Sequence, residues 1–177
     1  MTMMKKTGIF YGPAGGRTEK VAMRIGQLLG EGNYDLVSLD KANIKDINKY
    51  ENIIFGIATI GKETWDAEPV ESGWFDFMPE LEKTDLHGKK IAIYGLGDHV
   101  RWPNHFVDAI GELYKLLQGK GIDTVGKVSP DDYTFNESEA LVEGMFAGLP
   151  IDEDFEPDLT DQRIKEWVSQ IIKEFKV

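Results

Sequence analysis

The sequence predicts an α/β fold built on one parallel five-stranded sheet. Two observations support this prediction. Apolar runs alternate along the chain with segments in which apolar residues recur at helical spacing. One run, 52–58 (NIIFGIA), is almost continuously apolar, which is typical of a strand covered on both faces. Strands and helices that alternate in this way form parallel sheets with right-handed crossovers.

Five apolar runs bounded by turn residues are predicted to be strands. They lie at 6–11, 34–39, 52–58, 90–94 and 124–128. We expect the fifth strand to resume at 146–151, after an inserted excursion that is polar and acidic. No internal repeat and no linker divides the chain, so we expect a single domain spanning 1–177.

Apolar residues at helical spacing predict the helices. They lie at 17–30, 43–49, 72–82, 104–119 and 161–175. In the first helix Val21 and Ile25 lie on one face, and Gly30 marks its end. Phe106 and Ile110 begin the same pattern in the fourth.

Composition limits the classes of partner and chemistry. With 20 Lys and Arg against 31 Asp and Glu, the formal charge is −11, and such a field repels nucleic acid and anionic lipid. It favours docking to a protein with a basic face. The absence of cysteine excludes disulfides, thiolate-ligated clusters and thiol catalysis, so redox chemistry would require an organic cofactor. The start of the chain does not resemble a signal peptide and no run approaches a membrane span, so we expect a cytoplasmic protein.

The loop 12–18, between the first strand and the first helix, is a candidate phosphate site. Backbone N–H groups and the positive end of a helix dipole converge at such a turn. A nucleotide P-loop is not present, because only three residues separate Gly12 from Gly16 where that motif has four, and Arg17-Thr18 replaces its Lys-Ser/Thr pair. The spacing GxGxxG is also absent. A phosphate monoester held by amides and the Thr18 hydroxyl fits the loop; a tight turn that needs glycine for geometry alone stays an open alternative.

Two further loops follow predicted strand ends, and each carries a tryptophan. They are 59–65 and 95–103, and in parallel sheets ligands bind at these carboxyl ends. Trp102 lies off any helical stripe, which favours stacking on a planar ligand, whereas Trp65 fits either stacking or packing. Asp98 suits an acceptor for a ligand N–H better than a base. No Ser/His/Asp set and no metal-ligand spacing of the histidines stands out, so we expect neither side-chain catalysis nor a metal site.

Several stretches stand in the order of a known family. The stretches IFYG..GGRTEKVA, IIFGIAT, GKKIAIYGLGDH, FVDAIGELY, DDYTFNESEA and FAGLPIDED resemble the long-chain flavodoxins from the first strand to the last helix. The resemblance implies a flavodoxin-like, doubly wound five-stranded parallel sheet with helices on both faces, and a long-chain insertion at about 130–145 in strand five. It further implies a monomer with noncovalently bound FMN that shuttles single electrons between redox proteins.

The resemblance also assigns cofactor contacts. Loop 13–18 would hold the phosphate, 59–61 would line one face of the flavin ring, and Trp102 would cover the other. Asp98 would lie beside the pyrimidine edge and Asp154 near the ribityl chain. The full candidate set is Pro13, Ala14, Gly15, Gly16, Arg17, Thr18, Thr59, Ile60, Gly61, Trp65, Gly95, Leu96, Gly97, Asp98, Trp102, His105 and Asp154.

Three departures from the family pattern bear on affinity. Residues 13–15 carry no hydroxyl where the family is rich in Ser and Thr, and each missing hydrogen bond removes about 0.5–1.5 kcal/mol, so we expect weakened FMN binding. Arg17 replaces a small polar residue, and either contacts the phosphate or lies in solvent. Ile60 replaces the tryptophan often found on the inner ring face, with Trp65 as a possible substitute.

The functional prediction is a low-potential one-electron carrier, not an enzyme. Full reduction puts a negative charge on the flavin, and an acidic surrounding disfavours that charge. Two alternatives stay open. An NAD(P)H-dependent flavin or quinone reductase would need a nicotinamide site, which no sequence feature supplies; a flavin-free interaction module is motivated by the hydroxyl-poor phosphate loop.

Overall fold

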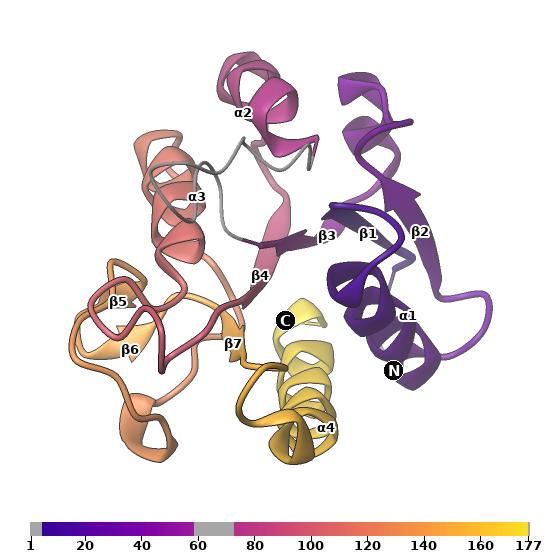
Figure 1. Cartoon of the computed structure of the whole chain (residues 1–177). Helices are drawn as coiled ribbons and strands as arrows, with labels where there is room; N and C mark the ends of the chain where they lie inside the picture. Colours follow the sequence, from indigo (N-terminus) through magenta and orange to yellow (C-terminus); the bar gives the residue numbers. More distant parts are fainter. Residues whose placement is uncertain (1–4, 59–72, 177) are drawn as a thin grey trace.

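The computed structural model describes residues 5–58 and 73–176 (Figure 1). The strands are β1 (Thr7–Gly12), β2 (Tyr34–Ser38), β3 (Asn52–Ile57), β4 (Lys90–Leu96), β5 (Leu141–Val142), β6 (Met145–Phe146) and β7 (Leu149–Ile151). The helices are α1 (Arg17–Leu29), α2 (Trp74–Lys83), α3 (Asp108–Gly119) and α4 (Pro157–Phe175), with 3-10 turns η1 (Ile44–Lys49) and η2 (Pro130–Asp132).

The main sheet has five parallel strands in the order β2-β1-β3-β4-β7. From β1 the chain first adds β2 on one side and then β3, β4 and β7 on the other. The strand order therefore reverses between β1 and β3, which makes their carboxyl ends the topological switch point of a doubly wound sheet.

Helices cover both faces of this sheet, as the sequence predicted. Figure 1 shows α1 and α4 on one side and α2 and α3 on the other. Side chains alternate along β1, so that Ile9 packs in the cluster with α1 and α4, while Phe10 packs in the cluster with α2 and α3. The central strand β3 is buried along its whole length, which confirms the interpretation of its apolar run.

Strand five differs from the prediction. The segment 124–128 makes only isolated bridges, from Val125 to Ala92 and from Val128 to Phe146, and the fifth strand of the sheet is β7 alone. Gly126 between them has a φ of +75°, which breaks the extended backbone. The excursion that follows contains η2 and the small antiparallel β5–β6 pair.

Helix bounds also differ from the prediction at three places. α3 begins at Asp108 rather than at 104, because Val107 lies in the left-handed region with φ +49°. α4 begins earlier than predicted, with Pro157 at its first position, where a missing N–H has no consequence. The helix expected at 43–49 is the 3-10 turn η1, capped reciprocally by Asn43 and Asp46.

Candidate functional site

A cavity of about 250 Å³ lies at the switch point, where β1, β3 and β4 end. It is lined by Pro13, Arg17, Thr18, Ala58, Leu96, Gly97, Asp98, Arg101, Trp102, Glu153 and Asp154. Most of these belong to the candidate set from the sequence, so the fold brings the phosphate loop, the loop after β4 and the segment after β7 together.

The loop from β1 to α1 presents an uncapped helix start to this cavity. Gly15 has a φ of +81°, a conformation that requires glycine, and the Gly12–Pro13 peptide bond is cis. The N-cap residue Gly16 has no side chain to accept from the first turn, whose amides have no partner within the helix. These amides and the dipole of the 13-residue helix α1 suit an anion.

Buried tyrosines fix the position of this helix start. The Tyr94 hydroxyl, fully buried under α1, donates to the Thr18 carbonyl at 2.8 Å. Tyr11 donates to Glu19 at 2.7 Å, and the Glu19 carboxylate also accepts from the Gly15 amide at 3.3 Å. Tyrosine side chains from β1 and β4 therefore hold the first turn of α1 in place.

The loop after β4 is organised by the carboxylate of Asp98, which is almost completely buried. Its Oδ1 accepts from the amides of Val100 and Arg101 at 3.0 and 2.8 Å, and its Oδ2 pairs with Arg101 Nε at 2.6 Å. The Asp98 carbonyl accepts from the Trp102 amide at 3.1 Å. Asp98 thus closes the turn that places Trp102, 36% exposed, at the wall of the cavity.

Asp152, which the sequence analysis did not single out, joins this loop to the segment after β7. Its Oδ1 accepts from the amides of Asp154 and Phe155 at 3.0 and 2.9 Å. Its Oδ2 accepts from the His99 amide at 3.1 Å and contacts His99 Nδ1. Complete burial opposes ionisation, but the hydrogen bonds from Phe155 and His99 outweigh it and lower the pKa of Asp152.

His99, Asp152 and Glu156 are near enough to one another to be considered as metal ligands. The Asp152 oxygens already accept several hydrogen bonds, and Arg163 pairs with Glu156 at 3.1 Å. A nearby guanidinium opposes a second cation at Glu156. We therefore interpret this cluster as a hydrogen-bonded support for the cavity rather than as a metal centre.

An ion-paired chain of side chains crosses the cavity. Arg17, at the start of α1, pairs with Asp154, which raises the pKa of the Arg17 guanidinium. Arg101 NH2 lies 3.8 Å from the same Asp154 carboxylate. The cavity lining therefore contains two guanidinium groups, those of Arg17 and Arg101. It also contains three carboxylates, those of Asp98, Glu153 and Asp154.

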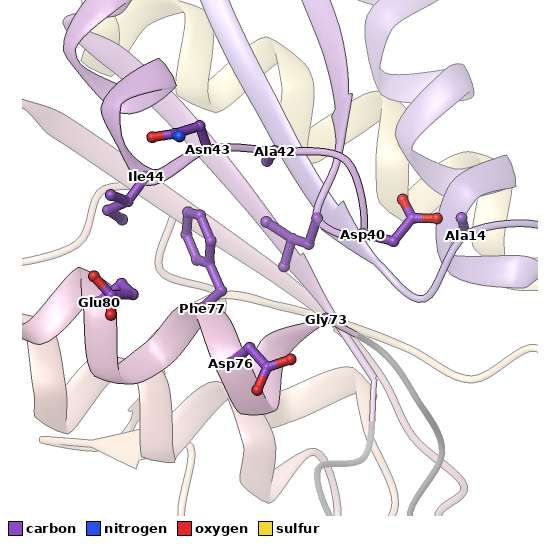
Figure 2. A pocket seen from close by; sticks show the side chains of 10 residues that line it. Ala14, Asp40, Ala42, Asn43, Ile44, Gly73, Asp76, Phe77 and Glu80 are labelled. Atoms are coloured by element: carbon purple, nitrogen blue, oxygen red, sulfur yellow. The ribbon is translucent and has the colours of Figure 1, made fainter.

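A second, larger cavity of about 710 Å³ lies on the other side of Ala14, between the end of β2 and α2. Figure 2 shows the carboxylates of Asp40, Asp76 and Glu80 around it. No cationic side chain accompanies these three among the described lining residues, so their charge disfavours a phosphate there. The first cavity also has three carboxylates, but it adds two guanidinium groups and the start of α1, which makes it the better anion site.

The remaining candidate residues fall into three groups. Gly95 is packed within β4, where a Cβ would lie 2.5 Å from Ile110 Cγ1, so its small size serves the contact with α3. His105 does not line the cavity; its exposed ring contacts Asp108 at 2.9 Å. The candidates Thr59, Ile60, Gly61 and Trp65 lie outside the described residues.

The structure adds Ala58, Arg101 and Glu153 to the cavity lining. Arg101 stands in the sequence three residues after Asp98, a spacing that suits a turn-closing ion pair, and this signal was available from the sequence. Glu153 lies within an acidic tract, where nothing in the sequence distinguishes it from its neighbours.

A doubly wound parallel sheet, with a helix start suited to an anion and a tryptophan beside one cavity at its switch point, is the arrangement of a mononucleotide-binding α/β protein. The family model described as Flavodoxin matches residues 9–167. The chain belongs to the flavodoxin family. Across the described residues, no helix is both long and apolar enough to cross a lipid bilayer.

Individual relatives agree with this assignment over nearly the whole chain. The flavodoxin of a Nostoc species is 42% identical over 173 residues, covering 98% of this chain and 99% of the relative. Flavodoxin 1 of Azotobacter vinelandii is 39% identical over 176 residues, covering 97% and 98%. The solved structure of the Fusobacterium nucleatum flavodoxin bound to flavin mononucleotide superposes with a TM-score of 0.84, at 31% identity, and covers 98% of this chain and 100% of that one.

Proposed function

We propose that this chain is a low-potential one-electron carrier that binds FMN noncovalently in the cavity at the switch point. The family assignment supports an FMN electron carrier, and flavodoxins transfer electrons rather than catalyse a reaction of their own. The observation that supports this site most directly is the meeting of an uncapped helix start with Trp102 and the Asp98 loop at one cavity.

The residues present fit the chemistry of this cofactor. Bound FMN would supply an isoalloxazine ring that accepts and releases electrons one at a time. The first-turn amides of α1 and the Thr18 hydroxyl would hold its phosphate, Trp102 would cover the ring, and Asp154 would accept from ribityl hydroxyls. The turn closed by Asp98 would present loop amides to the polar edge of the ring.

The charge of the chain supports a low potential. The three carboxylates of Asp98, Glu153 and Asp154 outnumber the two guanidinium groups in the cavity lining, and the chain as a whole carries a formal charge of −11. Negative potential raises the free energy of an added electron, most strongly in the step that leaves the flavin ring anionic. The acidic surroundings therefore push the second electron to lower potential than the first.

The same charge supports the proposal that the partners are redox proteins with basic docking faces, because opposite fields steer two proteins together. We infer a monomer in the cytoplasm from the family likeness. Sedimentation of the flavin-loaded protein measures the oligomeric state, and the salt dependence of electron transfer to a basic partner measures the steering.

A titration and a redox measurement test the function. Purified protein is titrated with FMN under fluorescence, and the loaded protein is then reduced stepwise under an absorption spectrometer. We expect saturable binding and two separated one-electron waves. A single two-electron wave contradicts the carrier, the absence of FMN binding favours the interaction module, and oxidation of NADPH by the protein alone favours the reductase.

A further inference from the structure

Arg17 occupies an electrostatically unfavourable position. It is the first residue of α1, where its positive charge meets the positive end of the helix dipole. An anion that lies beside both relieves this repulsion. Asp154, far along the chain, supplies that anion by pairing with the Arg17 guanidinium.

A second cation, Arg101, lies near Asp154. Its Nη2 atom lies 3.8 Å from the Asp154 carboxylate, and its Nε atom pairs with Asp98 at 2.6 Å. The Asp154 amide donates to the buried carboxylate of Asp152, which fixes the backbone that carries the Asp154 side chain. Asp154 therefore keeps a neighbouring guanidinium if Arg17 turns away, whereas Arg17 has no other carboxylate among the side chains that pair with it in the described residues.

The loop that would hold a phosphate offers few other donors. Pro13 has no amide N–H, residues 14–16 have no hydroxyl, and the Gly15 amide already donates to Glu19. A dianionic ester at this helix start would thus rely on the first-turn amides, on Thr18 and on a cation. The Arg17 side chain lines the same cavity as Thr18 and is more than half exposed, so burial does not confine it to the pair with Asp154.

We propose that Arg17 exchanges partners on ligand binding: its guanidinium breaks the ion pair with Asp154 and pairs with the phosphate of FMN. This exchange determines the preference of the chain for FMN over riboflavin. The inference rests on the proposed function. A doubly charged ester beside the helix start attracts the guanidinium more strongly than one carboxylate across the cavity. Asp154 competes with the phosphate for the Arg17 guanidinium. When Arg17 leaves, the guanidinium of Arg101 remains beside the Asp154 carboxylate.

The affinity ratio of FMN to riboflavin isolates the phosphate contribution, since contacts to the ring and ribityl chain are common to both ligands. We expect Arg17→Gln to lower this ratio about ten- to hundredfold, the range for a charge-assisted hydrogen bond. Asp154→Asn removes the competitor, so it should raise the ratio even if both affinities fall through lost ribityl contacts. In the double variant, removal of Asp154 should raise the ratio less than it does in the wild-type chain, because only the direct repulsion between Asp154 and the phosphate is then relieved.

Arg24→Gln is the matched control. Arg24 lies two turns further along α1 and pairs with Asp161 at 2.9 Å; it does not line the cavity itself, although its guanidinium lies 3.9 Å from the carboxylate of Glu153, which does. Its replacement removes the same charge from the same helix and should change the ratio much less than Arg17→Gln does. Fluorescence quenching gives both dissociation constants, thermal unfolding confirms that each variant is folded, and rising salt should reduce the ratio of the wild-type chain more than that of Arg17→Gln.

The outcomes separate this inference from the function on which it rests. If neither ligand binds the wild-type chain, the FMN site itself is wrong. If both bind and Arg17→Gln changes the ratio no more than Arg24→Gln does, the carrier stands and the exchange is refuted. A ratio that falls in Asp154→Asn also refutes it, since the carboxylate would then support the phosphate rather than compete with it.

Discussion

Replacing Asp152 by asparagine tests whether this buried carboxylate supports the cavity. Its Oδ1 accepts from the Asp154 and Phe155 amides, and its Oδ2 accepts from His99. In Asp152→Asn the amide oxygen retains the first two contacts, but its NH2 group faces the His99 backbone N–H. One buried donor then loses its acceptor, which destabilises the fold by about 1–3 kcal/mol.

The pH dependence of this loss follows from the lowered pKa of Asp152. A carboxyl whose pKa is lower in the folded than in the unfolded chain contributes its full stabilisation well above its ordinary value of 3.8, and the contribution falls as the pH drops through the folded value. The stability difference between wild type and Asp152→Asn should therefore be constant at neutral pH and should narrow only below about pH 4.

Urea unfolding of the flavin-free protein at a series of pH values measures this difference, because bound FMN would add its own stabilisation. The exposed Asp131→Asn, which removes the same charge from η2, is the control and should change stability by less than about 0.5 kcal/mol. A neutral-pH loss no larger than that of the control, or a loss that does not narrow in acid, would show that Asp152 does not join the two loops in this way.

Three further perturbations address the helix start, strand five and the ring site. Tyr94→Phe removes the hydrogen bond to the Thr18 carbonyl, so urea unfolding should show a loss of about 0.5–1.5 kcal/mol, and an unchanged midpoint contradicts the anchoring of α1. Gly126→Ala puts a Cβ at a φ of +75° and 2.7 Å from Trp167 Nε1, so thermal unfolding should show a loss of at least about 1–2 kcal/mol; a neutral result would mean that the left-handed turn is not required. Trp102→Ala should weaken FMN binding about tenfold by fluorescence titration while leaving the flavin-free stability nearly unchanged, and equal affinity would place the ring elsewhere.

The sequence was a good guide where structure depends on local pattern. The run 52–58 predicted a strand covered on both faces, and β3 is buried along its whole length. The prediction of a strand at 124–128 was wrong. Gly126 lies in the left-handed region, and the indole of Trp167 packs against its backbone and donates to its carbonyl. Whether a glycine interrupts a strand depends on what covers it, and the contact with a tryptophan 41 residues further on is not visible in local spacing.

At the cavity, too, the sequence predicted the features that depend on local pattern and missed those that depend on distant contacts. The glycine-rich turn and Trp102 were predicted from the sequence, and both line the cavity or its loop. Asp98 was assigned a ligand contact, and the structure shows its carboxylate closing its own turn beside the cavity. Asp152 was missed, because a buried aspartate within an acidic tract looks like its exposed neighbours until its donors are known.

By itself the sequence determined the alternation of strands and helices, the loop at the start of α1 and the acidic charge, since each depends on neighbouring residues or on composition. Only the tertiary structure decided which side chains meet across the cavity. Arg17 and Asp154 are 137 residues apart, and they pair because the order of the strands brings the start of α1 beside the segment after β7.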